Sequence, residues 1–155
     1  MPSTHHGILI HAVWSTKGRS RVLDKGWRDD LYAFMGGIAR EHQATLLRSG
    51  GMEDHVHLLI KIHPSYAIAD TIKLMKGNSS RWINEQSKLT CRFAWQKGYG
   101  AFSVSQSMAD TVKGYIERQE QHHARQTFEQ EYLDMLRKHE IDFDSRYVFD
   151  DEIIS

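Results

Sequence analysis

The sequence predicts an α+β fold, in which an antiparallel sheet of the ferredoxin-like or RRM-like kind carries helices on one face. Three observations support this prediction. The chain has 155 residues, 40% of them hydrophobic, which suits one domain with a single core. Its segments follow the order β-α-β-β-α-β-α. One of them, residues 54–62, alternates in polarity as a strand with two different faces does.

The first half of the chain predicts two strands and one helix. Residues 8–14 are mostly apolar and predict the first strand. Apolar side chains recur at helical spacing over residues 26–42 and predict the first helix. Residues 44–48 predict a short second strand, and the pair Gly50-Gly51 predicts the turn that follows it.

The predicted third strand ends before Pro64 and places two histidines on one face. Side chains alternate across a strand, so His55 and His57 point the same way. The opposite face is apolar and must be buried; it consists of Val56, Leu58, Ile60 and Ile62. The third strand is central in a ferredoxin-like sheet. We therefore expect its apolar face to pack on the helices and its histidines to emerge on the open face.

The second half of the chain predicts two further helices, a strand and a last helix. Ser65 is the expected N-cap of a helix whose apolar stripe continues to Trp82. Residues 101–105 predict the fourth strand, and residues 107–125 predict a polar helix. A last helix over residues 127–139 leads into an acidic tail.

Composition excludes several classes of protein. The single cysteine, Cys91, excludes an internal disulfide framework and a cysteine-rich zinc site. There is no signal-peptide apolar stretch, and no apolar run approaches the about 20 residues of a membrane span. We therefore expect a soluble, cytoplasmic protein. The formal net charge is zero, which argues mildly against a general nucleic-acid binder, but residues 129–152 carry many acids and the remainder is net basic.

The histidine pair could present two nitrogen ligands to one metal ion, although such a pair alone is more often incidental. Tyr115 and Gln119 are four residues apart and share one face of the predicted helix. Gln119 could add an oxygen ligand, and a tyrosine beside a metal suggests a nucleophile that forms a phosphotyrosine with a phosphodiester. His122 and His123 are alternative ligands, although a solvated helix face is their commoner role. The residues alone therefore support a hypothetical metal site.

Six stretches of the chain carry a more specific pattern, including the motifs His-Val-His and Tyr-Ile-Glu-Arg-Gln. They are residues 11–17, 51–60, 72–83, 95–105, 112–119 and 127–132. In order and spacing they make the chain resemble the single-tyrosine HUH transposases, the insertion-sequence-200-like group, over nearly its full length. The resemblance implies a transposase domain over residues 1–126, with the C-terminal helix and acidic tail at 127–155 as part of the same domain.

The resemblance also implies roles for particular residues. His55, His57 and Gln119 correspond to the metal ligands, and Tyr115 corresponds to the nucleophile. The family uses Mg²⁺ or Mn²⁺, cuts single-stranded DNA through a 5′-phosphotyrosine intermediate, and recognises imperfect hairpins. Its members act as homodimers, in which the tyrosine helix of one subunit can complete the histidine site of the other. The expected location is cytoplasmic, with the nucleoid as the place of action.

Basic and aromatic side chains are the expected DNA contacts. The basic set is Lys17, Arg19, Arg21, Lys73, Lys76 and Arg81. The aromatic set, for which core packing is at least as good an explanation, is Trp95, Tyr99 and Phe102. Two other functions stay open. One is a host-adopted or non-catalytic module that holds a hairpin without cutting it; the other is a phosphodiesterase in which water replaces the tyrosine.

Overall fold

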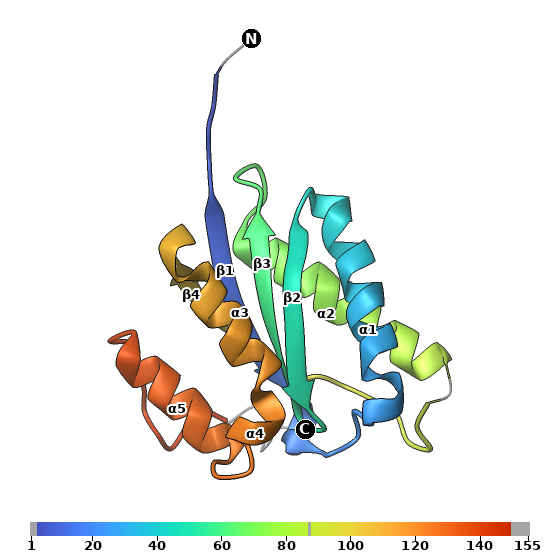
Figure 1. Ribbon diagram of the computed structural model, residues 1–155. Coiled ribbons are helices and arrows are strands. Elements are labelled where there is room, and N and C mark those ends of the chain that lie inside the picture. The colour runs from blue at the N-terminus through green and yellow to red at the C-terminus, as the bar shows by residue number, and fades with distance from the viewer. Residues whose placement is uncertain (1–2, 87, 150–155) are drawn as a thin grey trace.

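A four-stranded antiparallel sheet with helices on both faces forms the protein (Figure 1). The computed structural model describes residues 3–86 and 88–149. Its main elements are β1 (Ile8–Ser15), α1 (Lys25–Ala39), β2 (Thr45–Met52), β3 (His55–Ile62), α2 (Ile68–Glu85), β4 (Gly100–Val104), α3 (Ala109–Glu117), α4 (Gln119–His122) and α5 (Phe128–Lys138). Short 3₁₀ turns lie at Lys17–Arg19, Arg40–His42 and Gln106–Met108. The strand order β2-β3-β1-β4 confirms the predicted ferredoxin-like topology and the central place of β3.

One face of the sheet packs on α1 and α2, as the alternation in β3 predicts. Its four apolar side chains join a single buried cluster with Leu31 and Met35 of α1 and with Ile72 and Met75 of α2. The second helix begins later than expected, because its N-cap is Ala67, whose backbone is extended, and not Ser65. The prediction of Ser65 as the cap is therefore wrong.

The predicted turn at Gly50-Gly51 is also wrong, since both glycines belong to β2 and pair with β3. The chain reverses direction after Met52 instead. The reason for glycine at position 50 is a close packing contact with α3. A Cβ there would lie 2.3 Å from the carbonyl oxygen of Ile116, so only glycine lets α3 approach β2 this closely.

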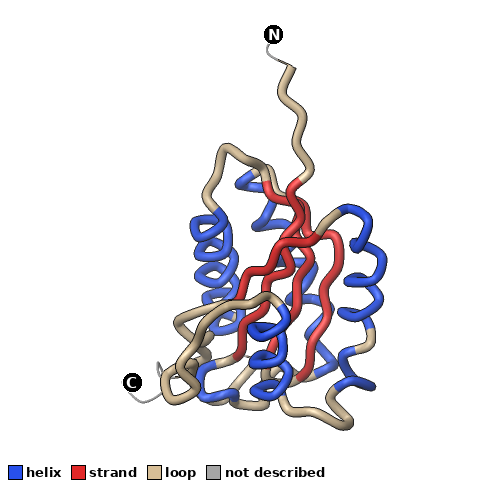
Figure 2. Tube along the Cα trace, turned by 90° about the vertical axis from the view of Figure 1, so that its left-hand side faces the viewer, coloured by secondary structure: helices blue, strands red, loops and turns tan. Residues whose placement is uncertain are grey.

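The second face of the sheet is covered and not open, which corrects the expectation for the histidines. Figure 2 shows helices on both sides of the sheet. Leu59 packs against Ile116 of α3, and Phe102 of β4 packs against Phe128 of α5. These apolar side chains need cover as much as those of the first face. Beneath that cover, both His55 and His57 are 0% exposed.

The polar helix predicted over residues 107–125 is divided in two. Arg118, with φ −98° and ψ 26°, ends α3 and precedes the single turn of α4. The last helix, α5, starts with a capping box in which the side chains and backbones of Thr127 and Gln130 bond reciprocally. Part of the predicted acidic tail, residues 150–152, lies outside the described residues. No helix within the described ranges is long and apolar enough to cross a membrane.

Candidate active site

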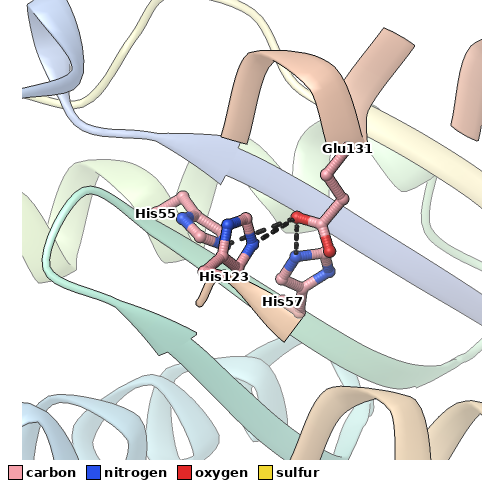
Figure 3. A group of neighbouring side chains, drawn as sticks. All are labelled: His55, His57, His123 and Glu131. Atoms are coloured by element: carbon pink, nitrogen blue, oxygen red, sulfur yellow. Dashed lines mark hydrogen bonds and ion pairs between the residues drawn. The ribbon is translucent and has the colours of Figure 1, made fainter. Parts of the chain in front are cut away.

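The two histidines of β3 are each held by a neighbour through Nδ1. His55 Nδ1 lies 2.7 Å from Asp54 Oδ1, and His57 Nδ1 lies 2.8 Å from Nε2 of His11 on the adjacent strand. Hydrogen bonds on one ring nitrogen orient an imidazole and leave the other nitrogen for a ligand. Both Nε2 atoms consequently face the same buried space between the sheet and the C-terminal helices (Figure 3).

A glutamate from α5 lies at the centre of that space. Glu131 Oε1 is 2.9 Å from His57 Nε2 and 2.9 Å from His123 Nε2, and it is 3.6 Å from His55 Nε2. The residue is only 2% exposed, so the carboxylate depends on these partners in place of water. Figure 3 shows the three imidazoles around it.

The second oxygen of Glu131 contacts the predicted tyrosine and glutamine. Glu131 Oε2 accepts a hydrogen bond from Gln119 Nε2 at 3.1 Å and another from the Tyr115 hydroxyl. Despite the break in the helix at Arg118, the side chains of Tyr115 and Gln119 therefore both reach Glu131 Oε2. His122 adds a nitrogen 3.3 Å from the Tyr115 hydroxyl. The structure thus brings together all four residues that the sequence predicted for metal binding and catalysis.

The donor atoms present suit a divalent cation. One ligand atom from each of His55, His57, His123 and Glu131 lies within 4.8 Å of the others. When His55 Nδ1 donates to Asp54, its Nε2 lone pair faces Gln119 Oε1 at 3.0 Å, so two acceptors confront each other. A cation between these two atoms would accept both lone pairs. Mixed imidazole, carboxylate and amide donors fit Mn²⁺ and related ions.

Burial and the central carboxylate shift the pKa values in this group. Burial lowers the pKa of His57 to about 4 and that of His11 to about 3, so both rings are neutral at pH 7, the state in which an imidazole can bind a metal. Burial opposes the charge on Glu131, but hydrogen bonds from His123 and His57 outweigh it and hold its pKa well below the usual range. Burial and then Glu131 raise the pKa of Tyr115.

The six residues predicted to contact DNA do not form one surface. Arg19 and Arg21 line a groove that also contains Asp54 and His123, but each pairs with an acid, Glu129 at 3.2 Å or Glu53 at 2.8 Å. The three on α2 belong to the opposite side of the sheet. Lys76 Nζ there bonds three backbone carbonyls of residues 96–98, and Arg81 bonds Asn78. Of the aromatic set, Trp95 and Phe102 are core residues.

The comparison with known protein families decides the classification. Residues 4–119 match the family described as "Transposase IS200 like", which is well over half of the chain. The chain belongs to the IS200-like transposase family. Its match covers the histidine strand and extends through Tyr115 to Gln119, and it ends before His123 and Glu131.

Individual IS200-like proteins show the same similarity. The ISDra2 transposase TnpA of Deinococcus radiodurans is 32% identical over 117 residues, covering 72% of this chain and 84% of that protein. The IS200 transposase of Salmonella typhimurium is 27% identical over 124 residues, covering 72% and 81%.

Solved structures share the fold. A candidate transposase from Deinococcus radiodurans R1 has a TM-score of 0.62 and 28% identity, covering 77% of this chain and 95% of that one. A REP-associated tyrosine transposase bound to a REP hairpin has a TM-score of 0.59 and 12% identity, covering 79% and 74%, which shows the fold alone.

For three residues of the site, the sequence alone predicts no role. His11 belongs to β1, beside β3 in the sheet, and supports His57 from there. Asp54 directly precedes the histidine strand. Glu131 interrupts the apolar stripe that Phe128, Tyr132 and Met135 form on α5, and an acid on a buried stripe is the signal that would have found it.

Proposed function

We propose that this IS200-like protein is a metal-dependent transesterase that cuts and rejoins single-stranded DNA. One observation carries the proposal. The Tyr115 hydroxyl and the side chains of His57 and Gln119 all bond to the same buried carboxylate, so a nucleophile and a set of metal ligands share one point of the molecule. Neither a core tyrosine nor a structural histidine requires such an arrangement.

Tyr115 is the proposed nucleophile. Its oxygen forms a bond to the scissile phosphorus while the bond from phosphorus to the 3′ oxygen breaks, which leaves a 5′-phosphotyrosine and a free 3′-hydroxyl. The phenolic proton leaves to one of the two acceptors within reach, Glu131 Oε2 or His122 Nε2, and the departing 3′ oxygen takes up a proton from water. Attack by a 3′-hydroxyl reverses the step and joins the strands.

Mg²⁺ or Mn²⁺ is the proposed cofactor, held by His55, His57 and Gln119, with His123 and Glu131 as further donors. Such an ion withdraws charge from a bound phosphate and lowers the pKa of a neighbouring phenol. The latter matters here because burial and Glu131 raise the pKa of Tyr115.

The proposed substrate is single-stranded DNA with imperfect hairpins beside the cleavage sites, and the proposed place of action is the cytoplasm, at the nucleoid. The similarity to insertion-sequence transposases supports this substrate. The solved relative that is bound to a REP hairpin shares the fold. The division into residues 1–126 and 127–155 also stays a prediction.

A covalent adduct tests the function. The protein is incubated with Mn²⁺ and an oligonucleotide that carries a hairpin and a candidate cleavage site, and adducts are separated on a denaturing gel. We expect an adduct with the unaltered chain and none with Tyr115→Phe or with EDTA. An equal adduct in Tyr115→Phe removes the tyrosine from this role. Binding that persists in EDTA without an adduct indicates the non-catalytic module, and free products without an adduct indicate hydrolysis by water.

The proposed homodimer with exchange of the tyrosine helix needs a separate test, because in this chain Tyr115 lies beside its own histidines. The ring centroids of Tyr115 and His57 are 5.7 Å apart. Inactive Tyr115→Phe and His57→Asn chains are mixed and assayed for the adduct. An adduct in the mixture supports exchange between subunits, whereas its absence supports a site completed within one chain.

A further inference from the structure

A groove lies between α4 and α5, two helices of the layer that covers the second face of the sheet. Figure 1 shows these two helices next to each other. Its volume is about 890 Å³, and its lining is mainly basic and amide side chains. Among them are Arg118, Gln121, His122, Arg125, Gln130 and Arg137. None of these was singled out as a DNA contact from the sequence.

The groove leads to the candidate nucleophile. His122, which lines it and is 37% exposed, places Nε2 3.3 Å from the Tyr115 hydroxyl. Arg118 lies on the same path: a Cβ at Gly114, the residue before the tyrosine, would be 2.8 Å from its guanidinium. A chain of phosphates in the groove would therefore reach Tyr115 past these two side chains.

The charges of the groove favour an anion. Arg118 and Arg125 have no acidic partner among the described residues. The one acid in the lining, Asp134, is already engaged by Arg137 at 3.1 Å and by Gln126 at 2.8 Å. On the other side of the loop before α5, Arg19 and Arg21 are neutralised by their own acids. Among the described residues that line this groove, Arg118 and Arg125 thus carry positive charge that no acid compensates.

We propose that this groove holds the single strand of DNA next to the scissile phosphate, with Arg118 and Arg125 contacting backbone phosphates. Guanidinium groups bind phosphate through paired N–H donors, and the amides of Gln121 and Gln130 add donors and acceptors for bases or sugars. The inference rests on the proposed function, since that function makes DNA the substrate, and it adds where the strand lies.

Binding without cleavage separates this inference from the proposed function. Tyr115→Phe protein in EDTA is titrated into a fluorescent oligo-dT strand, and anisotropy gives Kd at several salt concentrations. In that background we compare Arg118→Gln/Arg125→Gln with Arg40→Gln/Lys88→Gln, which removes two exposed charges elsewhere. We expect the Kd of the groove variant to rise by at least ~10-fold. The slope of log affinity against log salt concentration should fall in magnitude by about 1.4, the value for two phosphate contacts with a single strand. The control should leave both unchanged.

The proposal for the groove is overturned if the affinity and salt slope of Arg118→Gln/Arg125→Gln equal those of the control. It is also overturned if the parent protein does not bind single strands. Preference for a duplex over oligo-dT would also overturn it in favour of a hairpin stem. A second measurement uses the single cysteine, Cys91. In a Cys91→Ser background, Gln121→Cys should exchange with a strand that carries an activated mixed disulfide, which forms a protein–DNA disulfide and releases the small thiol. This exchange should be faster than that of Lys88→Cys, and equal rates would contradict the proposal. The adduct assay judges the chemistry separately.

Discussion

Replacement of Glu131 by glutamine probes the centre of the site. The change keeps the shape of the side chain and removes its charge. Glu131 is 2% exposed and lies 2.9 Å from Nε2 of the neutral His57 and 2.9 Å from Nε2 of His123, whose pKa is raised, so the loss resembles the breaking of a buried ion pair with His123. Such losses cost about 3 kcal/mol. For a chain of this size, that corresponds to a fall in Tm of roughly 6 to 12 °C.

The sign of this effect depends on pH. Because the pKa of Glu131 is held below its value in an unfolded chain, its contribution to stability is present at pH 7 and declines as the pH falls below about 4.3. The difference in Tm between Glu131→Gln and the unaltered protein should therefore be largest near neutral pH and should shrink in acid. Thermal unfolding in EDTA measures it without contributions from a metal.

Glu131→Gln should also weaken metal binding. Glu131 supplies the one carboxylate of the four-residue donor group, so we expect Mn²⁺ to bind at least ~10-fold more weakly in calorimetric titrations. The matched control is Glu129→Gln on the same helix, where the side chain is 44% exposed and pairs with Arg19. That pair is worth at most about 1 kcal/mol, and its loss should leave Mn²⁺ affinity unchanged. An unchanged Tm and Mn²⁺ affinity in Glu131→Gln would refute the reasoning.

Two further predictions concern stability. Burial lowers the pKa of His57 to about 4 and that of His11 to about 3, so between pH 6.5 and pH 5 the unfolded chain binds protons that the folded one does not. The raised pKa of His123 offsets part of this loss of stability. The free energy of unfolding in EDTA should therefore fall by about 2 kcal/mol from pH 6.5 to pH 5. Urea titrations that give the same free energy at both pH values would contradict the prediction. Gly50→Ala should lower the free energy of unfolding by about 3 kcal/mol, because the new Cβ meets the backbone of α3. The control is Gly37→Ala, whose Cβ meets nothing within 4 Å and should stabilise α1 by about 0.5 kcal/mol. Equal denaturation midpoints of the two variants would argue against the close packing of β2 and α3.

Much of the sheet and part of the site are local in origin, which is why the sequence predicts them. Alternation along β3 requires His55 and His57 to share a face, whatever surrounds them. Helical spacing puts Tyr115 and Gln119 on the same side, and the break at Arg118 does not undo this. The order of the elements then limits the sheet to few arrangements, with β3 in the centre.

What the sequence did not reveal depends on contacts between distant segments. Periodicity marks Glu131 as an unusual acid on an apolar stripe, but only the packing of α5 over the sheet places it 2.9 Å from His57, 74 residues away in the chain. The same packing buries the face that was expected to be open, and it creates the groove beside Tyr115. A glycine pair predicts a turn, but Gly50 serves the close approach of α3, whose contacting residue, Ile116, lies more than 60 positions later in the chain.

The sequence by itself therefore determined the order of strands and helices, the shared face of the histidine pair and the four-residue spacing of Tyr115 and Gln119, because backbone geometry sets each of these locally. Only the tertiary structure decided which groups meet them: His11 behind His57, Glu131 between the imidazoles and the tyrosine, and Arg118 along the approach to it. These contacts form because α3 and α5 bury their apolar surfaces on the sheet, and such burial depends on the whole fold.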